Sequence, residues 1–331
     1  MIKRILYIAV VCGAAIVFTG VLLADQPIPS DFTYGVSFSK FHADELKLEY
    51  KSVLLALLDD LKVRHFRFSA HWPMIEPTKD RYDFNALDYQ MQQARLRDAE
   101  VILGVGRRLP GWPECHEPQW ASSLSKEAKE QEILDYIRAV VTQYKSYGNL
   151  KYWQVENEPF LTRFSQEACG GLDIGFLERE IALVRELDPM RPIILTDGGE
   201  FGMWLPAWKR ADVFGSTMYL YIWNPQLGKI RYPIGPRFFR IKRGILELIG
   251  GNKPSIVVEL SAEPWLLQSI TNTPIDVQLD RMNIDKFNEI LGFSQKTSFD
   301  TFYLWGAEWW YWMKTKQNHP EFWNRARELF E

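Results

Sequence analysis

Glutamates near the ends of strand-like segments are the residues of this sequence best suited to chemistry. Residues 153–160 read WQVENEPF, so an apolar, β-rich approach leads into Glu156, Asn157 and Glu158. Much later, SIVVEL at 255–260 places Glu259 near the end of a similar segment. Buried carboxylates are costly unless they are paired or used. Two of them can serve as a nucleophile and a general acid, which makes these segments candidates for one catalytic site.

Aromatic residues are the second chemical signal. The 331 residues include 13 Trp, 14 Tyr and 20 Phe, which fit either a large aromatic core or stacking surfaces for sugars. Two carboxylates together with aromatic faces are what glycoside hydrolysis requires. A phosphate-binding loop and a cluster with metal-ligand spacing are not evident, so we expect no cofactor and no metal. The net charge of −3 gives no general attraction for nucleic acid.

The elements that must position these residues alternate between strands and helices. β-branched or aromatic segments of strand length lie at 32–39, 65–72, 100–106, 150–157, 192–198, 213–220, 255–260 and 301–309. Between them, segments such as KEQEILDYIRAVVTQYK repeat apolar residues at helical spacing. Strict alternation predicts parallel strands with right-handed crossovers.

Eight such units predict a (β/α)₈ barrel, which typically needs about 250 residues plus insertions. A doubly wound open sheet is the alternative, but it usually has a glycine-rich loop after its first strand. That position reads SFSKFHADEL here, without glycine. In a barrel the active site lies at the carboxyl ends of the strands, where the glutamates fall.

WQVENEPF resembles the fourth-strand signature of the retaining glycoside hydrolases of clan A, in which an Asn-Glu pair closes the strand. The resemblance implies that Glu158 is the general acid/base and that Asn157 contacts a substrate hydroxyl. It implies that Glu259 is the nucleophile, with Glu263 as a second candidate. The family within the clan is not assigned, and sugar, linkage and endo or exo mode stay open.

Further substrate-binding residues follow from the same resemblance. RFSAHWPMIEP at 67–77 is similar to the second strand of β-glucosidases and β-galactosidases, and YLWGAEWW resembles the eighth-strand ending. The residues implied to bind substrate, or to hold the nucleophile, are Arg67, His71, Trp72, Asn157, Tyr219, Trp305 and Glu308. His71 and Trp72 could instead plug the barrel rim, Glu308 could hold a neighbouring loop, and Glu156 is interpreted as structural.

Two other functions use the same residues. A transglycosylase that remodels surface polysaccharide differs only in how well the cleft excludes water. A non-catalytic barrel could bind glycan through its tryptophans, and it would tolerate loss of Glu158 and Glu259. The mechanism we expect is double displacement with retention of configuration, which needs carboxyl groups about 5–5.5 Å apart.

The N-terminal residues 1–25 are interpreted as a membrane anchor or a signal peptide. Residues 5–24 contain no charge and are long enough to span a bilayer. Lys3 and Arg4 precede them, which predicts that the domain at 26–331 faces the periplasm or the cell exterior. Either it stays anchored or it is secreted after cleavage.

Two cysteines outside that segment, Cys115 and Cys169, form an even pair in an oxidising compartment. They are either a disulfide that braces the cleft rim or two unrelated thiols. A basic segment at 229–244, expected to be a loop, is the last feature. It is either a solvated loop or a contact for anionic lipid or an acidic glycan.

Overall fold

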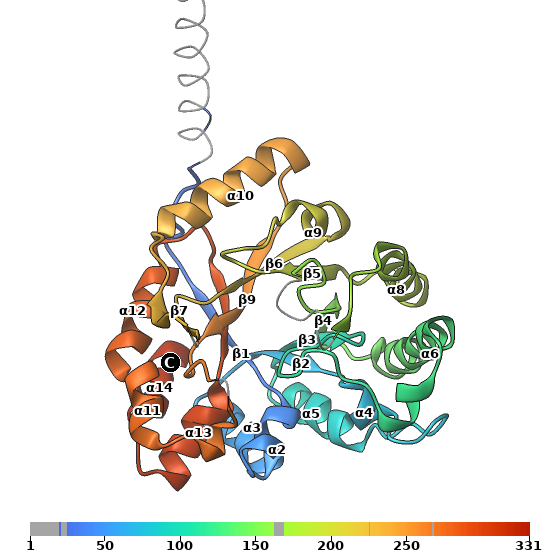
Figure 1. Ribbon diagram of the computed structural model, residues 1–331, viewed down its shortest axis with the longest axis horizontal. Helices are drawn as coiled ribbons and strands as arrows, with labels where there is room; N and C mark the ends of the chain where they lie inside the picture. The colour runs from blue at the N-terminus through green and yellow to red at the C-terminus, as the bar shows by residue number, and fades with distance from the viewer. Residues whose placement is uncertain (1–19, 21–24, 162–168, 225, 267) are drawn as a thin grey trace, which may run out of the picture.

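Eight parallel strands close into a barrel in the computed structural model, which describes residues 20, 25–161, 169–224, 226–266 and 268–331 (Figure 1). Around the barrel the order is β1-β10-β9-β6-β5-β4-β3-β2. This confirms the predicted (β/α)₈ barrel. The barrel strands are β1 Thr33–Ser37, β2 His65–Ser69, β3 Glu100–Val105, β4 Leu150–Val155, β5 Ile193–Asp197, β6 Val213–Met218, β9 Ser255–Ser261 and β10 Thr301–Trp305.

Helices surround the strands, and one extra hairpin follows β6 (Figure 1). The hairpin consists of β7 Tyr221–Asn224 and β8 Gly228–Arg231. The α-helices are α2 Lys40–Glu45, α3 Tyr50–Asp59, α4 Trp72–Ile75, α5 Asn85–Arg95, α6 Lys126–Tyr144, α8 Ile174–Leu187, α9 Leu205–Arg210, α10 Pro236–Gly250, α11 Ile275–Arg281, α12 Ile284–Ser294, α13 Ala307–Lys316 and α14 Glu321–Phe330.

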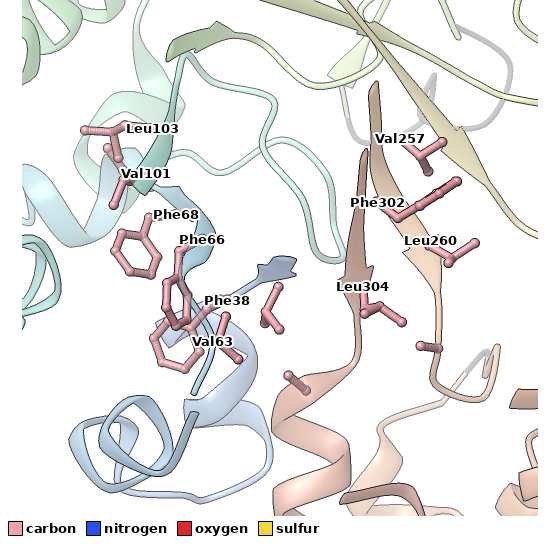
Figure 2. Close-up of a cluster of buried hydrophobic side chains, with 14 of the residues drawn as sticks. Phe38, Val63, Phe66, Phe68, Val101, Leu103, Val257, Leu260, Phe302 and Leu304 are labelled. Carbon is pink, nitrogen blue, oxygen red and sulfur yellow. The ribbon is translucent and has the colours of Figure 1, made fainter. Parts of the chain in front are cut away.

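Strand β2 shows how alternation separates the core from the site. Successive side chains of a strand point to opposite faces. Phe66 and Phe68 therefore pack into the large apolar cluster that also includes Val101 and Leu103 of β3 (Figure 2). Arg67, between the two phenylalanines, points into the barrel and reaches β4 and β9. The barrel core thus fixes the position of a buried cation.

Strand β9 departs from simple alternation just where the predicted nucleophile lies. Its pairing with β6 steps from Val257 to Glu259, with a register shift between Ser216 and Thr217. Val258 packs inside the barrel with Ile256, and Glu259 also reaches inward to Arg67. A bulge of this kind re-aims a side chain, and such bulges are frequent beside active sites. Here it turns Glu259 into the barrel.

Two sequence-based boundaries were wrong. The eighth strand ends at Trp305 instead of continuing to 309, because Gly306 adopts a φ of 118° and caps helix α13. Glu308 therefore lies on a helix. The basic segment 229–244 is not a loop, because it comprises the end of β8 and the first part of α10, which begins at Pro236. Proline is favoured at the first turn of a helix because its missing N–H is not needed there.

The predicted N-terminal anchor or signal segment, 5–24, lies outside the described residues except for Gly20. Within the part of the chain that the structure describes, none of the helices is both long enough and apolar enough to cross a membrane.

Candidate active site

Glu259 lies at the centre of a buried hydrogen-bond network. Its Oε1 accepts a hydrogen bond from Nη1 of Arg67 at 2.6 Å, and its Oε2 accepts one from the hydroxyl of Tyr219 at 2.9 Å. Glu259 is 4% exposed and Arg67 is 2% exposed. The guanidinium supplies the positive charge that an ionised buried carboxylate needs. A carboxylate fixed in this way is suited to act as a nucleophile.

Arg67 links that carboxylate to the end of β4. Its Nε donates to Oε1 of Gln154 and its Nη2 donates to Oδ1 of Asn157, both at 2.7 Å. Asn157 uses its oxygen in this contact, so its amide NH₂ is the part left to meet a ligand. Gln154 was not predicted as a site residue, although it lies two residues after Tyr152, which packs against the apolar cluster inside the barrel.

Glu158 lies in the turn after β4, with a φ of 45°, while Glu156 has a φ of 56°. Left-handed conformations are uncommon for residues other than glycine, and they persist where the surroundings determine them. Here the N–H of Glu158 donates to Oγ1 of Thr196 at 2.7 Å, and the hydroxyl of Thr217 donates to its Oε1 at 2.8 Å. Both threonines come from inward-facing strand ends, and neither was predicted as a site residue.

The electrostatic surroundings of Glu158 favour its protonated form. Burial raises the pKa of Glu158 well above its usual value, and the negative charges of Glu259 and Glu114 raise it further. Among the described residues, no cation forms an ion pair with Glu158 that matches the 2.6 Å pair of Glu259 with Arg67. Two carboxyl groups whose surroundings differ in this way can act as an acid and a nucleophile.

Glu156 points away from this network, as its interpretation as a structural residue requires. Its two carboxylate oxygens accept hydrogen bonds from the backbone N–H groups of Arg107 and Arg108, at 2.8 and 2.6 Å. Burial raises the pKa of Glu156, and a hydrogen bond with Glu180 of α8 opposes the shift. Glu156 therefore fastens the β3 loop to the turn that carries Glu158.

Glu263 positions a tryptophan at the same end of the barrel. One carboxylate oxygen accepts a hydrogen bond from the indole N–H of Trp305 at 2.7 Å, and the other contacts Nε2 of His42 at 2.8 Å. Burial opposes a charge on His42, but Glu263 and Glu45 hold its pKa well above the usual value. The His42 ring also stacks on Trp305, with centroids 5.6 Å apart. Glu263 thus holds Trp305 and His42, whereas Glu259 is the carboxylate whose charge acts on Glu158, which favours Glu259 as the nucleophile.

Three other predicted residues are fully or almost fully buried. Trp72 begins helix α4, donates its indole N–H to Glu76 and stacks against Tyr136, so it contributes to the helix layer. Glu308 is 0% exposed and accepts a hydrogen bond from the backbone N–H of Ser39 at 2.5 Å. Trp72 therefore supports the barrel. For Glu308 the second carboxylate oxygen, Oε2, is buried and has no hydrogen-bond partner among the described residues.

His71 also has a supporting position. It is 1% exposed, and its Nε2 lies 3.2 Å from the carbonyl oxygen of Pro110. Its ring contacts His116, whose Nε2 lies near the carbonyl oxygens of Leu109 and Gly111. Burial lowers the pKa of His71 well below its usual value, so the imidazole is neutral. The two histidines hold the loop that follows β3.

A disulfide joins Cys115 in that loop to Cys169 after β4, which confirms the predicted pair. The loop also carries Glu114, a third carboxyl group beside the network, with a φ of 74°. Burial raises the pKa of Glu114 to about 7; Arg108 opposes the shift, and the negative charge of Glu259 adds to it. Sequence reasoning missed Glu114, because the fold of the β3 loop decides where it points.

The basic side chains of 229–244 have partners within the chain. Arg237 and Arg240 bind Asp25, Arg231 binds Glu289, and Arg243 binds Glu247. Lys229 pairs with Asp280, and Lys242 donates to the carbonyl oxygen of Gly199. The proposed contact with anionic lipid at this segment therefore gains no support from the structure.

Comparisons with known proteins agree with the barrel fold. Residues 47–171 match the model of glycosyl hydrolase family 10, and no curated protein matches the chain. Among solved structures, an endo-β-1,4-xylanase of glycoside hydrolase family 10 from Gloeophyllum trabeum is 15% identical, with a TM-score of 0.56. That match covers 93% of this chain and 98% of the xylanase.

Two other similar structures are longer proteins. An exo-β-1,4-mannosidase from Opitutaceae bacterium strain TAV5 is 17% identical with a TM-score of 0.55, over 85% of this chain and 53% of that chain. A β-galactosidase from Rahnella sp. R3 is 11% identical with a TM-score of 0.54, over 92% of this chain and 57% of that chain. The chain thus spans about half the length of these two proteins. The comparisons confirm the resemblance to clan A glycoside hydrolases with a (β/α)₈ barrel.

Proposed function

We propose that this protein is a retaining glycosidase that cleaves O-glycosidic bonds of a poly- or oligosaccharide by double displacement. Glu259 is the nucleophile and Glu158 is the general acid/base. The single observation that carries the proposal is the contrast between these two carboxyl groups. Glu259 is paired with Arg67 at 2.6 Å, whereas burial and like charge raise the pKa of Glu158 well above its usual value.

The reaction uses each group twice. An oxygen of Glu259 attacks the anomeric carbon while Glu158 gives its proton to the departing oxygen, which leaves a covalent glycosyl-enzyme. Glu158, now a carboxylate, takes a proton from water, and the water oxygen attacks the same carbon and releases Glu259. Two inversions give net retention. In this scheme Asn157 and Trp305 contact the reacting sugar, and Tyr219 and Arg67 orient the nucleophile.

The stereochemistry of the first product tests the proposal. The full-length chain is incubated with aryl glycosides and polysaccharides, and the anomeric proton of the newly formed sugar is followed by NMR. We expect the configuration of the substrate, and we expect Glu259→Gln to abolish turnover while the exposed control Glu328→Gln does not. Inversion, or full activity of Glu259→Gln, would contradict the proposal. A product joined to a second sugar would identify a transglycosylase.

We also propose that the domain works outside the cytoplasm, anchored through residues 5–24 or secreted after their cleavage. The disulfide between Cys115 and Cys169 supports this location, because disulfides persist mainly in oxidising compartments. Protease treatment of intact cells should degrade an anchored domain, and a secreted one should appear in the medium. A protected domain that stays inside the cells would refute both versions.

A further inference from the structure

A small pocket lies beside the reaction centre, between the β7–β8 hairpin and helix α11. Its walls include Trp223 and Lys229 of the hairpin, Trp265 and Glu263 after β9, and Arg281 and Lys286 at α11 and α12. The pocket has room for a small polar group rather than for a whole sugar ring. The aromatic rings of Trp223 and Trp265 at its wall offer flat surfaces on which a sugar ring can stack.

The pocket is adjacent to the nucleophile. The hydroxyl of Tyr219 binds Glu259 at 2.9 Å, and the ring of Tyr219 meets the edge of Trp265 at a centroid distance of 5.3 Å. Glu263, which also lines the pocket, binds the indole N–H of Trp305. A sugar next to the reacting one, or a substituent on the reacting sugar, can therefore reach the pocket.

The charge at the pocket is positive. Lys229 is neutralised by Asp280, and Glu263 is matched by His42. Within the part of the chain that the structure describes, neither Arg281 nor Lys286 forms an ion pair with a carboxylate. Lys286 donates to the backbone carbonyl oxygens of Asp280 and Arg281 at the end of α11. Asp280 attracts both cations without a direct contact, so among the described residues neither guanidinium nor ammonium is held in an ion pair.

Arg281 is held in a fixed orientation. Its guanidinium lies over the ring of Trp223, 4.4 Å from the centroid, and its Nη1 donates to the carbonyl oxygen of Trp265 at 3.1 Å. Its other N–H groups have no hydrogen-bond partner among the described residues, and arginine presents its donors in a planar fork that matches a carboxylate. Because the side chain is already ordered by stacking, little rotational freedom is lost when an anion binds.

We propose that this pocket is a subsite for the carboxylate of an acidic sugar, with Arg281 as the residue that recognises it. The inference deepens the proposed function and rests on it, since it names a substrate class: glycans that contain uronic acid. It also relocates the predicted acidic-glycan contact of 229–244. Of that segment's six Lys and Arg residues, only Lys229 lines the pocket, and the recognition comes from α11.

Binding measured without turnover tests the subsite. Methyl β-D-glucuronide and methyl β-D-glucoside differ only in the carboxylate, and each is titrated into the full-length chain with Glu259→Gln, which blocks the proposed reaction, while tryptophan fluorescence is recorded. A charge-assisted hydrogen bond to the carboxylate predicts that the glucuronide binds about tenfold more tightly. Arg281→Gln should remove this preference, and added salt should weaken it. The matched control is Arg325→Gln, because Arg325 lies on α14 and binds Asn288 and Glu328 instead.

Equal affinity for the two methyl glycosides, no binding of the glucuronide, or a preference that survives Arg281→Gln would each overturn the subsite. Methyl sulfate is titrated in parallel, and tighter binding of sulfate than of the glucuronide would also overturn the assignment to a carboxylate. These results are independent of catalysis. A glucuronide preference in a chain that hydrolyses no glycoside would leave the subsite standing and remove the proposed glycosidase, and hydrolysis without the preference would do the reverse.

Discussion

Arg67 and Glu259 form a buried ion pair across the barrel, with 2.6 Å between Nη1 and Oε1. The two residues come from strands β2 and β9, which are not neighbours in the barrel. The contact therefore crosses the interior of the barrel, and both side chains are buried. Removing one partner of such a pair leaves an uncompensated buried charge.

Replacement of Arg67 should affect stability and activity together. We expect Arg67→Met to lower the free energy of unfolding by about 3–5 kcal/mol, because Glu259 is left charged and unpaired. Adding Glu259→Met should recover part of that loss, since the second change removes the stranded charge. Urea unfolding of the two single variants and the double variant measures the coupling. Additive losses would show that the pair is not coupled.

Substitution of Glu158 should have an effect that depends on the leaving group. Without its proton donor, the Glu158→Gln enzyme should lose about 10²–10⁴-fold in kcat/KM on substrates with poor leaving groups. A dinitrophenyl glycoside, whose leaving group needs no proton, should be affected much less. Glu156→Gln is the neighbouring control and should show no such dependence. Similar losses of Glu158→Gln on both kinds of substrate would exclude Glu158 as the acid.

The alkaline limb of the pH–rate profile should report Glu158. Burial and two like charges raise its pKa, so the protonated acid persists to a higher pH than an ordinary carboxyl group. One of those charges, Glu114, has a pKa of about 7 and acts on Glu158 mainly above that pH. Glu114→Gln should therefore move the alkaline limb to lower pH by roughly 0.5–1 pH unit. An unchanged limb in kcat/KM would contradict this electrostatic link.

The disulfide between Cys115 and Cys169 should stabilise the β3 loop. The cross-link spans 54 residues, and loss of such a link typically costs about 2–4 kcal/mol. We expect a reductant to lower the thermal midpoint of the wild type and to leave the Cys115→Ser/Cys169→Ser variant unchanged. Activity should fall with the midpoint, because the loop carries Arg108 and Glu114. A wild type that is insensitive to reductant while its thiols are free would refute the prediction.

Glu308 should make stability depend on pH. Burial raises the pKa of Glu308 from 4.5 to about 7, with His42 opposing the shift, and a difference of this size corresponds to roughly 3 kcal/mol. Because the folded-state pKa is raised, this stabilisation is complete below about pH 4.5 and is lost as the pH rises through 7. Glu308→Gln cannot ionise, so its unfolding free energy should vary less between pH 5 and 8. Identical pH slopes, judged against the exposed control Glu328→Gln, would rule this out.

All eight barrel strands were predictable, because their length and composition are local properties of the sequence. The inward position of Glu259 was not, since strict alternation from Val258 would turn it outward and the bulge in β9 depends on pairing with both neighbours. Thr217 and Gln154 were missed for a related reason. Their roles come from register across the barrel, and nothing in their local sequence distinguishes them from ordinary strand residues.

The remaining site residues were misplaced because the sequence does not determine where loops and helices begin and end. Gly306 ends β10 early, so Glu308 enters a helix and is buried. Trp72 is the first residue of a short helix that has Pro73 in its first turn, and its indole stacks against Tyr136. The position of Glu114 beside the network could not be predicted, because it depends on the path of the β3 loop. In each case the residue type was informative, and the path of the backbone decided whether the side chain reaches the site.

The separation between the strand network and the hairpin has a consequence for engineering. The hydrogen bonds around Glu158 and Glu259 come from β2, β4, β5, β6, β9 and the residues that directly follow them, whereas Trp223 and Arg281 come from the hairpin and α11. Grafting a different hairpin and α11 should therefore exchange substrate preference while the reaction machinery stays intact. The barrel strands would then keep the reaction, and the hairpin and α11 would be the segments to exchange.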